Sequence, residues 1–165
     1  MVTLYNVISH DWFITDKDGS EDFIPDELWP QTLEIYRQFD VLAMGRKTYE
    51  TIQAYPSALT QSFEKLSGRK VVVTHDPHLE VREGYQVVTS LEAVLEASSN
   101  VLVSSGPTLN NYLLEHALVD TIIFHQLPIN IDIGTEVFAP GYRNLLTLVS
   151  ETDEGIAKKL LYHLG

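Results

Sequence analysis

Cysteine is absent from this 165-residue chain, which excludes disulfide bonds, thiolate metal ligands and a cysteine nucleophile. Long apolar runs are missing too, since no segment approaches the roughly 20 apolar residues that a membrane-spanning helix needs. The N-terminal segment has no basic residues before its first apolar stretch, so we expect no secretory leader. These absences predict a soluble, cytoplasmic protein that needs no covalent or metal cross-link.

Positive charge is scarce. Eleven Lys and Arg residues stand against 23 Asp and Glu, a net charge of −12, and the resulting field opposes general binding to nucleic acid or to anionic membranes. A phosphorylated ligand must therefore be held locally. Two short segments at the ends of predicted strands supply the candidate cations, Arg46, Lys47, Arg69 and Lys70. The alternative is that these four are solvated charges at strand ends.

Several common catalytic signatures are also missing. The chain has no G-x-S-x-G nucleophile elbow, and its six histidines form no metal-binding pair at helical spacing. Neither a Walker motif nor a G-x-G-x-x-G fingerprint is present. We therefore expect no metal site and disfavour a hydrolase. His125, inside an apolar strand-like segment, is expected to be a core histidine that is hydrogen-bonded in place.

Apolar runs alternate with helix-period segments along the whole chain without a linker or repeat, which predicts a single domain over residues 1–165. Strands are predicted at Thr3–Ser9, Val41–Met44, Lys70–Thr74, Gln86–Val88, Val101–Ser104, Thr121–Leu127, Leu145–Glu151 and Ala157–Leu164. Helices are predicted at Asp26–Phe39, Lys47–Ala54, Leu91–Ser98 and Thr108–His116. The predicted fold class is α/β, a mostly parallel eight-stranded sheet between helices that ends in a C-terminal antiparallel hairpin.

Two strand-to-helix junctions have the layout of an anion site. In VLAMGRKTYE an apolar strand ends at Gly45 and leads directly into a helix, and VLVSSGPTLN repeats the pattern around Gly106. Glycine lets a ligand come close, and the unpaired N–H groups of the first helical turn point toward an anion. We expect the two junctions to hold a diphosphate together at the carboxyl edge of the sheet. Ordinary helix caps are the alternative.

Two further segments carry candidate polar groups. After the strand VVVT, Thr74 and His75 can meet a ribose or its phosphate, while Asp76 favours a free 2′-hydroxyl over a 2′-phosphate. His75 is alternatively a surface histidine in a turn. The acidic connection Ile8–Glu27 is expected to be a lid or gate without secondary structure.

Four carboxylates of this acidic connection are possible proton donors, Asp11, Asp22, Asp26 and Glu27. Glu27 stands out because it lies in the first helical turn beside apolar residues, where partial burial would raise its pKa. The helix N-terminus would favour the ionised carboxylate instead. The sign of the net shift stays open at this point.

In this order, the segments resemble the dihydrofolate reductase superfamily, and within it the reductase domain of the riboflavin-biosynthesis bifunctional deaminase-reductase. MGRKTYE is similar to the M-G-R-x-T-[WY]-E segment of those enzymes, and GRKVVVTHD to their second cofactor strand. The stretch SSGPTLNNYLLEHALVDTIIFHQLPI resembles the S-G-G-P-T-L…L-V-D-E…P pattern, and GTEVF resembles G-x-x-x-F. DKDGSEDFIPDELW is similar to the loop that covers the nicotinamide.

The resemblance implies a dihydrofolate reductase-like three-layer sandwich that binds NADPH, with NADH not excluded, and that forms a homodimer. The implied cofactor-binding residues are Val7, Ile14, Gly45, Arg46, Lys47, Thr48, Thr74, His75, Ser104, Ser105, Gly106, Pro107, Thr108 and Leu109. Glu27 and Asp11 are the implied catalytic acids. The implied substrate is a small heterocycle, first 5-amino-6-(5-phosphoribosylamino)uracil and second a dihydrofolate or other pterin. A non-catalytic nucleotide-binding module and a phosphotransferase are the alternatives.

The chain departs from the family pattern at three places. Trp12 stands where riboflavin-type relatives have glycine and is expected to narrow the substrate mouth. Ser104 and Ser105 replace a pair of glycines, which leaves the geometry of that turn open. Few cations accompany Asp76, so a preference for NADPH over NADH depends mainly on Arg46 and Lys47.

Overall fold

A computed structural model describes residues 1–165. Its strands are β1 (Val2–Ile8), β2 (Phe13–Asp16), β3 (Val41–Gly45), β4 (Arg69–Val73), β5 (Tyr85–Val88), β6 (Val101–Val103), β7 (Thr121–Gln126), β8 (Gly134–Glu136), β9 (Leu146–Asp153) and β10 (Lys158–Leu164). Its α-helices are α1 (Trp29–Tyr36), α2 (Arg46–Gln53), α3 (Ser57–Glu64), α4 (Leu91–Ala97) and α5 (Pro107–Glu115), and two 3₁₀ turns are η1 (Asp26–Leu28) and η2 (Pro140–Leu145).

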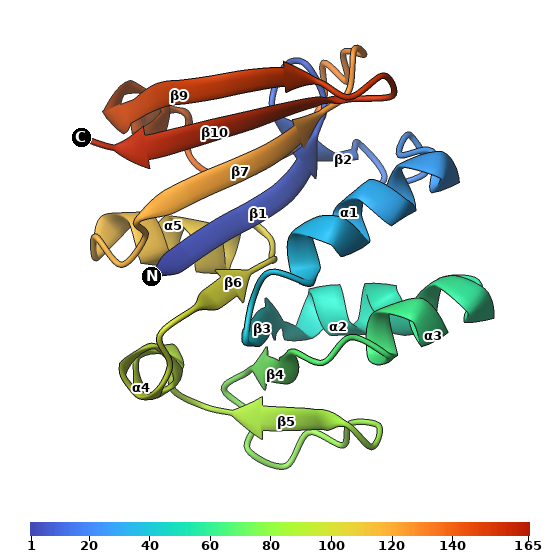
Figure 1. The fold of residues 1–165 in the computed structure, drawn as a ribbon, viewed down its shortest axis with the longest axis vertical. Coiled ribbons are helices and arrows are strands. Elements are labelled where there is room, and N and C mark those ends of the chain that lie inside the picture. Colours follow the sequence, from blue (N-terminus) through green and yellow to red (C-terminus); the bar gives the residue numbers. More distant parts are fainter.

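Eight of the strands form one sheet in the order β5-β4-β3-β6-β1-β7-β10-β9 (Figure 1). All pairings from β5 to β7 are parallel, whereas β10 runs antiparallel to both β7 and β9. Most residues of the central strands are apolar and buried, as Val101–Val103 illustrates. Such strands must be covered on both faces. The predicted α/β class, the mostly parallel eight-stranded sheet and the C-terminal hairpin are confirmed.

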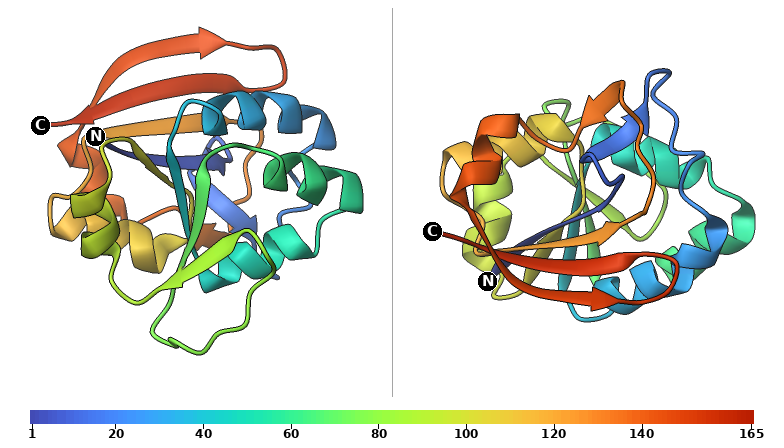
Figure 2. Two further views of the ribbon diagram at one scale, coloured as in Figure 1. Left: turned by 60° about the horizontal axis from the view of Figure 1, so that its bottom comes forward. Right: turned by 90° about the horizontal axis from the view of Figure 1, so that it is seen from above.

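The core has two main parts, one on each face of the sheet. Helices α1, α2 and α3 pack on one face around Tyr36, Ile52 and Phe63. Helices α4 and α5 pack on the other face around Val94 and Leu113. Figure 2 shows the twisted sheet between these two helix groups. The predicted three-layer arrangement is therefore confirmed. None of the helices is both long enough and apolar enough to cross a membrane.

The acidic connection after β1 is not devoid of structure, and that expectation was wrong. It contains β2, which pairs antiparallel with β8 in a separate two-stranded sheet. Gly134 allows this pairing, because a Cβ atom there would collide with the backbone oxygen of Thr15. The sequence hides the pairing because both strands are short and half-buried, so neither shows an apolar alternation.

The structure differs from the predicted helices at two places. The segment predicted as one helix from Asp26 to Phe39 begins as the 3₁₀ turn η1 and continues as α1, which ends at Tyr36. Helix α3 was not predicted at all. Only Leu59 and Phe63 are large apolar residues in its eight positions, too few for a clear helical period.

Candidate functional site

The two glycine- and serine-bearing junctions lie side by side. Strands β3 and β6 are paired neighbours, with Ala43 opposite Val103, so their carboxyl ends reach the same edge of the sheet. The backbone N–H of Ser104 donates to the carbonyl of Ala43 at 3.0 Å. The N–H of Gly45 donates to the Oγ of Ser105 at 3.2 Å. The structure thus brings together the junctions around Gly45 and around residues 104–106.

Helices α2 and α5 begin at these junctions with free donors. Neither helix has a side-chain cap; their N-cap residues are Gly45 and Gly106. The first N–H groups of an α-helix have no partner within the helix, and they carry the positive end of its dipole. Around Gly106 no atom lies within 4 Å of the position that a Cβ would occupy, so the approach to α5 is open.

Ser105 belongs to the framework of this edge. It is buried, and its Oγ accepts the N–H of Gly45, so this N–H is not left free for an anion. Its carbonyl accepts from the side chain of Asn6 at 2.8 Å and from that of Asn110 at 3.3 Å. The Ser104–Ser105 peptide is trans, like every other peptide bond in the chain. The backbone donors that remain for an anion are then the N–H groups in the first turns of α2 and α5.

The predicted cations separate into two groups. Arg46 and Lys47 are exposed at the start of α2, and Nε of Arg46 lies 2.9 Å from the carboxylate of Glu50. Thr48 follows them and is half-buried. Lys47 could therefore bind a phosphate at this turn directly, whereas Arg46 would first have to break its ion pair with Glu50.

Arg69 and Lys70 are not part of this edge, so that expectation was wrong. They begin β4, and the start of a parallel strand lies at the edge opposite its carboxyl end. Lys70 is buried, and its Nζ donates to the carbonyl of Leu66 at 2.6 Å and to that of Gly68 at 3.1 Å. Burial lowers the pKa of this amine. Lys70 therefore holds the α3–β4 connection instead of a ligand.

Thr74 and His75 follow the carboxyl end of β4, directly beside the junction at Gly45, which pairs with Val73. His75 is exposed. The Oγ1 of Thr74 accepts the N–H of Asp76 at 3.2 Å, so these residues form a compact turn. The turn lies on the same edge as the start of α2.

Val7 presents its backbone to a gap in the sheet. The carbonyl of Ile8 accepts the N–H of Leu127, which follows β7. Since alternate residues direct their backbone groups to opposite neighbours, Val7 faces the β6 side. There β6 has already ended at Val103, which pairs with Leu4. Ile14 lies on β2 and packs against the core on the α5 face, so its side chain belongs to a different cluster from that of Val7.

Neither of the two predicted acids is a buried carboxyl group. The carboxylate of Asp11 accepts from Ser9 Oγ at 2.7 Å and from the N–H groups of Ile131 and Asp132 at 3.0 and 2.9 Å. Desolvation opposes the effect, but these hydrogen bonds lower the pKa of Asp11, so it is an ionised clamp near neutral pH. Glu27 is exposed in η1, contrary to the partial burial that was expected.

Trp12 also lies elsewhere than expected. Its φ of 72° is in the left-handed region, which glycine adopts readily and tryptophan rarely. The ring packs edge-on against Phe124 and Phe138 at 5.2 and 5.8 Å, below the guanidinium of Arg143 at 4.8 Å. Trp12 therefore packs against the core on the α5 face.

Sequence reasoning missed a row of three aromatic residues that begins beside Ser104, and an acid at the far end of that row. Trp29, Tyr36 and Tyr55, here called the aromatic wall, meet edge-on with ring centres 6.4 and 5.7 Å apart. The hydroxyl of Tyr36 lies 3.3 Å from Ser104 Oγ, and that of Tyr55 lies 3.5 Å from Glu21. Burial raises the pKa of Glu21. The seven-residue spacing of Trp29 and Tyr36 was the one available signal, because it places both on one helix face.

A surface hollow of about 490 Å³ has no residue of the aromatic wall in its lining. It adjoins Pro107 and Asn111 of α5 and is otherwise lined by Phe13 and by residues 132–136 and 138–139. Its charged lining residues, Asp132 and Glu136, are both acidic. This hollow is unsuited to phosphate, so the junction edge remains the candidate site.

Comparison with known proteins gives a clear result at the level of structure only. No protein-family model and no curated protein sequence matches the chain. Among solved structures, a putative riboflavin biosynthesis protein from Shewanella sp. PV-4 matches with a TM-score of 0.75 and 19% identity, over 99% of this chain and 98% of that one.

Two further structures extend this likeness. The Thermotoga maritima diaminohydroxyphosphoribosylaminopyrimidine deaminase/5-amino-6-(5-phosphoribosylamino)uracil reductase matches with a TM-score of 0.75 and 15% identity, over 100% of this chain and 56% of that one. Enterococcus faecalis dihydrofolate reductase, solved with NADP(H) and RAB-propyl, matches with a TM-score of 0.70 and 18% identity, over 100% and 96%. The chain therefore has the dihydrofolate reductase-like fold, which it shares with riboflavin-biosynthesis reductases.

Proposed function

We propose that this protein is an NADPH-dependent reductase that reduces a small heterocyclic substrate. The observation that carries the proposal is the pair of uncapped helix N-termini, α2 and α5, joined at one sheet edge by the Gly45–Ser105 contact. Two such termini offer converging N–H donors to the two phosphates of a dinucleotide. The Enterococcus structure with NADP(H) supports the same assignment by fold.

The residues at the edge fit an extended dinucleotide. The first turn of α2, with Arg46, Lys47 and Thr48, would hold the adenosine phosphate and one side of the diphosphate. The open turn from Gly106 to Leu109 would hold the other side. Thr74 and His75 would meet the adenosine, and the free backbone of Val7 would hold the nicotinamide carboxamide. When bound, the reduced nicotinamide supplies a hydride, and the protein supplies position and a proton.

The aromatic wall favours a planar substrate, because a flat ring can lie against the half-buried rings of Trp29 and Tyr55. Our first choice is a substrate of the 5-amino-6-(5-phosphoribosylamino)uracil type. A pterin is the second choice. By the resemblance, Glu27 corresponds to the acidic proton-relay residue of the folate enzymes. Its exposed position argues against a pterin substrate, because a proton relay to a bound pterin needs a carboxyl group inside the site.

Titration with NADPH and with NADH tests the proposal. We expect NADPH to bind to the wild type, and Lys47→Ala to weaken NADPH more than NADH if Lys47 reads the 2′-phosphate. The matched control is Lys65→Ala at the exposed end of α3, which should leave both affinities unchanged. If neither NADPH nor NADH binds to the wild type, the assignment is refuted. If Lys47→Ala weakens NADPH and NADH binding equally, Lys47 contacts the diphosphate and not the 2′-phosphate.

A further inference from the structure

Two buried asparagines hold the carbonyl group that precedes Gly106. Nδ2 of Asn6 donates to the carbonyl oxygen of Ser105 at 2.8 Å, and Nδ2 of Asn110 donates to the same oxygen at 3.3 Å. Asn6 and Asn110 are 8% and 0% exposed. We call these two residues the asparagine pair. Buried amides destabilise a core unless they are hydrogen-bonded, and here both amides bond one carbonyl of the candidate site.

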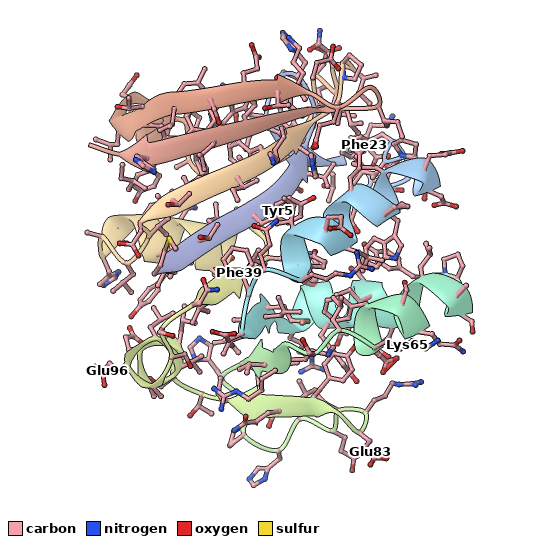
Figure 3. The ribbon with its side chains drawn as sticks, viewed as in Figure 1. Tyr5, Phe23, Phe39, Lys65, Glu83 and Glu96 are labelled. Atoms are coloured by element: carbon pink, nitrogen blue, oxygen red, sulfur yellow. The ribbon has the colours of Figure 1, made fainter.

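The asparagine pair comes from β1 and α5. Tyr5 points toward α1, where its hydroxyl lies 3.1 Å from Oγ1 of Thr32 (Figure 3). Successive residues of a strand point to opposite faces of the sheet, so Asn6, the next residue of β1, faces α5. Strand β6 has already ended at Val103, which pairs with Leu4. The turn that follows β6 therefore lies beside Asn6, and the Asn6 amide bonds this turn.

The orientation of the Asn110 amide follows from its partners. Besides the carbonyl of Ser105, its Nδ2 lies 3.1 Å from Oδ1 of Asn6 and 2.9 Å from the carbonyl oxygen of the buried Val137. All three partners can only accept a hydrogen bond, so the nitrogen end of the amide must face them. Oδ1 of Asn110 is then left in the core without a partner. The fold keeps this donor at a cost in stability, because an unpaired buried oxygen is unfavourable.

The held carbonyl fixes the direction of the next N–H group. The carbonyl of Ser105 and the N–H of Gly106 belong to one planar peptide unit, which is trans, so the two groups point in opposite directions. Because the carbonyl points toward the asparagine pair, the Gly106 N–H points away from it. This N–H has no hydrogen-bond partner within the chain. Gly106 is only half-buried, so a ligand can reach the free N–H.

The direction of this N–H matters because α5 begins with a proline. The unpaired N–H groups of a helix are counted from its N-cap residue, here Gly106. Pro107, at the next position, has no N–H. The first turn of α5 therefore has only the N–H groups of Gly106, Thr108 and Leu109 for an anion. If the peptide were reversed, one of these three donors would be lost, and the Ser105 carbonyl would face the anion and repel it.

We propose that the asparagine pair orients the Ser105–Gly106 peptide so that the Gly106 N–H donates to the diphosphate of the bound dinucleotide. This inference rests on the proposed reductase function. Asn6 and Asn110 act through the peptide, so they are positioning residues. Ser105 is fixed at two points, because its Oγ accepts the N–H of Gly45 while its carbonyl is held by the pair. The donor is therefore oriented before the cofactor binds, which reduces the entropy lost on binding.

The first test follows the amide of Gly106 in the wild-type protein by NMR. In the free protein this hydrogen should exchange rapidly with solvent, because it has no partner. Saturating NADPH should slow the exchange about tenfold or more, as expected for a hydrogen bond to a charged group, and should shift the amide proton signal downfield. Adenosine 2′,5′-bisphosphate is the control ligand. It lacks the diphosphate bridge, and its 5′-phosphate would lie on the α2 side, so the Gly106 amide should stay unprotected.

The second test removes the donor amides one at a time. Asn6→Leu and Asn110→Leu keep the branched shape of the side chain but have no N–H, so the Ser105 carbonyl is held less firmly. We expect each variant to bind NADPH about tenfold more weakly and to keep its affinity for adenosine 2′,5′-bisphosphate. The matched control is Asn111→Leu, because Oδ1 of Asn111 accepts the N–H of Ala139 and does not contact the turn. This control should keep both affinities.

The outcomes separate the two proposals. If NADPH binds to the wild type but the Gly106 amide stays unprotected, the asparagine pair has no such role and the reductase proposal stands. The same conclusion follows if both Leu variants bind NADPH as the wild type does, or if they lose both ligands equally, as a merely structural role predicts. A wild type that does not bind NADPH would refute both proposals. The exchange measurement needs no variant, so it decides the question even if neither Leu variant folds.

Discussion

Ser105 joins the two halves of the candidate site, because its Oγ accepts the backbone N–H of Gly45 at 3.2 Å. The contact is so close that a Cβ on residue 45 would lie 2.8 Å from this oxygen. One small side chain therefore fixes the distance between the starts of α2 and α5, which a diphosphate must span.

Gly45→Ala should destabilise the protein by about 1–2 kcal/mol, because Ser105 must turn away and the Gly45 N–H loses its partner. The φ of −76° at residue 45 suits alanine, so the cost comes from the contact and not from the backbone. In a Ser105→Gly background the same change should cost less. Urea unfolding of the two single variants and the double variant measures this coupling. Additive losses would refute the close contact.

Lys70→Ala should destabilise the protein by about 2 kcal/mol, because two buried carbonyls lose a charged donor. The matched variant Lys47→Ala should change stability by less than about 0.5 kcal/mol, since the side chain is exposed. NADPH affinity should show the reverse order, with the loss confined to Lys47→Ala. Urea unfolding and cofactor titration of both variants check the contrast. A stable Lys70→Ala with weak NADPH binding would show that Lys70 acts at the cofactor after all.

Asp11→Asn should destabilise the protein by about 1 kcal/mol at pH 7, allowing for solvent screening, because the ionised Asp11 accepts three hydrogen bonds. Since the folded-state pKa of Asp11 is lowered, its contribution is present above the unfolded pKa and disappears as the pH falls through the folded value. The difference between wild type and variant should therefore shrink in acid. Asp22→Asn, at an exposed position, should show no such pH dependence.

Trp12→Gly should destabilise the protein by about 2 kcal/mol, because the lost aromatic packing outweighs the relief of the left-handed backbone, worth about 1–2 kcal/mol. Asp132 has a φ of 68° but is exposed, so Asp132→Gly relieves a similar strain without loss of packing. Its stability should stay within about 0.5 kcal/mol of the wild type, as strain relief and added unfolded-state freedom oppose each other. Thermal unfolding of both variants gives the comparison. A stabilised Trp12→Gly would show that strain dominates.

Strands with continuous apolar sequences were predictable, because burial on both faces leaves a signal in every residue, as in Val71–Thr74. The pairing of β2 with β8 was not, since it depends on a close approach at Gly134 that only the folded backbone defines. From the sequence, Lys47 and Lys70 were both candidates to bind a phosphorylated ligand, because both are lysines beside a predicted strand. The structure places them at opposite ends of parallel strands, and the strand order and direction that decide this cannot be read from residue type.

The candidate site was also predictable only in part. The two strand-to-helix junctions indicated which edge of the sheet holds the site, but the sequence did not indicate which carboxyl groups are buried. Burial depends on the tertiary fold: Glu21, in a loop, is half-buried and contacts Tyr55, which is distant in sequence, whereas Glu27 is exposed. His125 is buried and hydrogen-bonded, as expected of a core histidine. Homodimer formation, a cytoplasmic location and the preference for NADPH over NADH stay predictions.

The early end of β6 leaves a notch in the middle of the sheet, where the N–H and C=O of Val7 have no strand beside them. A carboxamide bound in the notch would form hydrogen bonds with the N–H and C=O of Val7, in place of the strand that is missing there. The amide hydrogen of Val7 should then exchange more slowly when the notch is occupied than when it is empty.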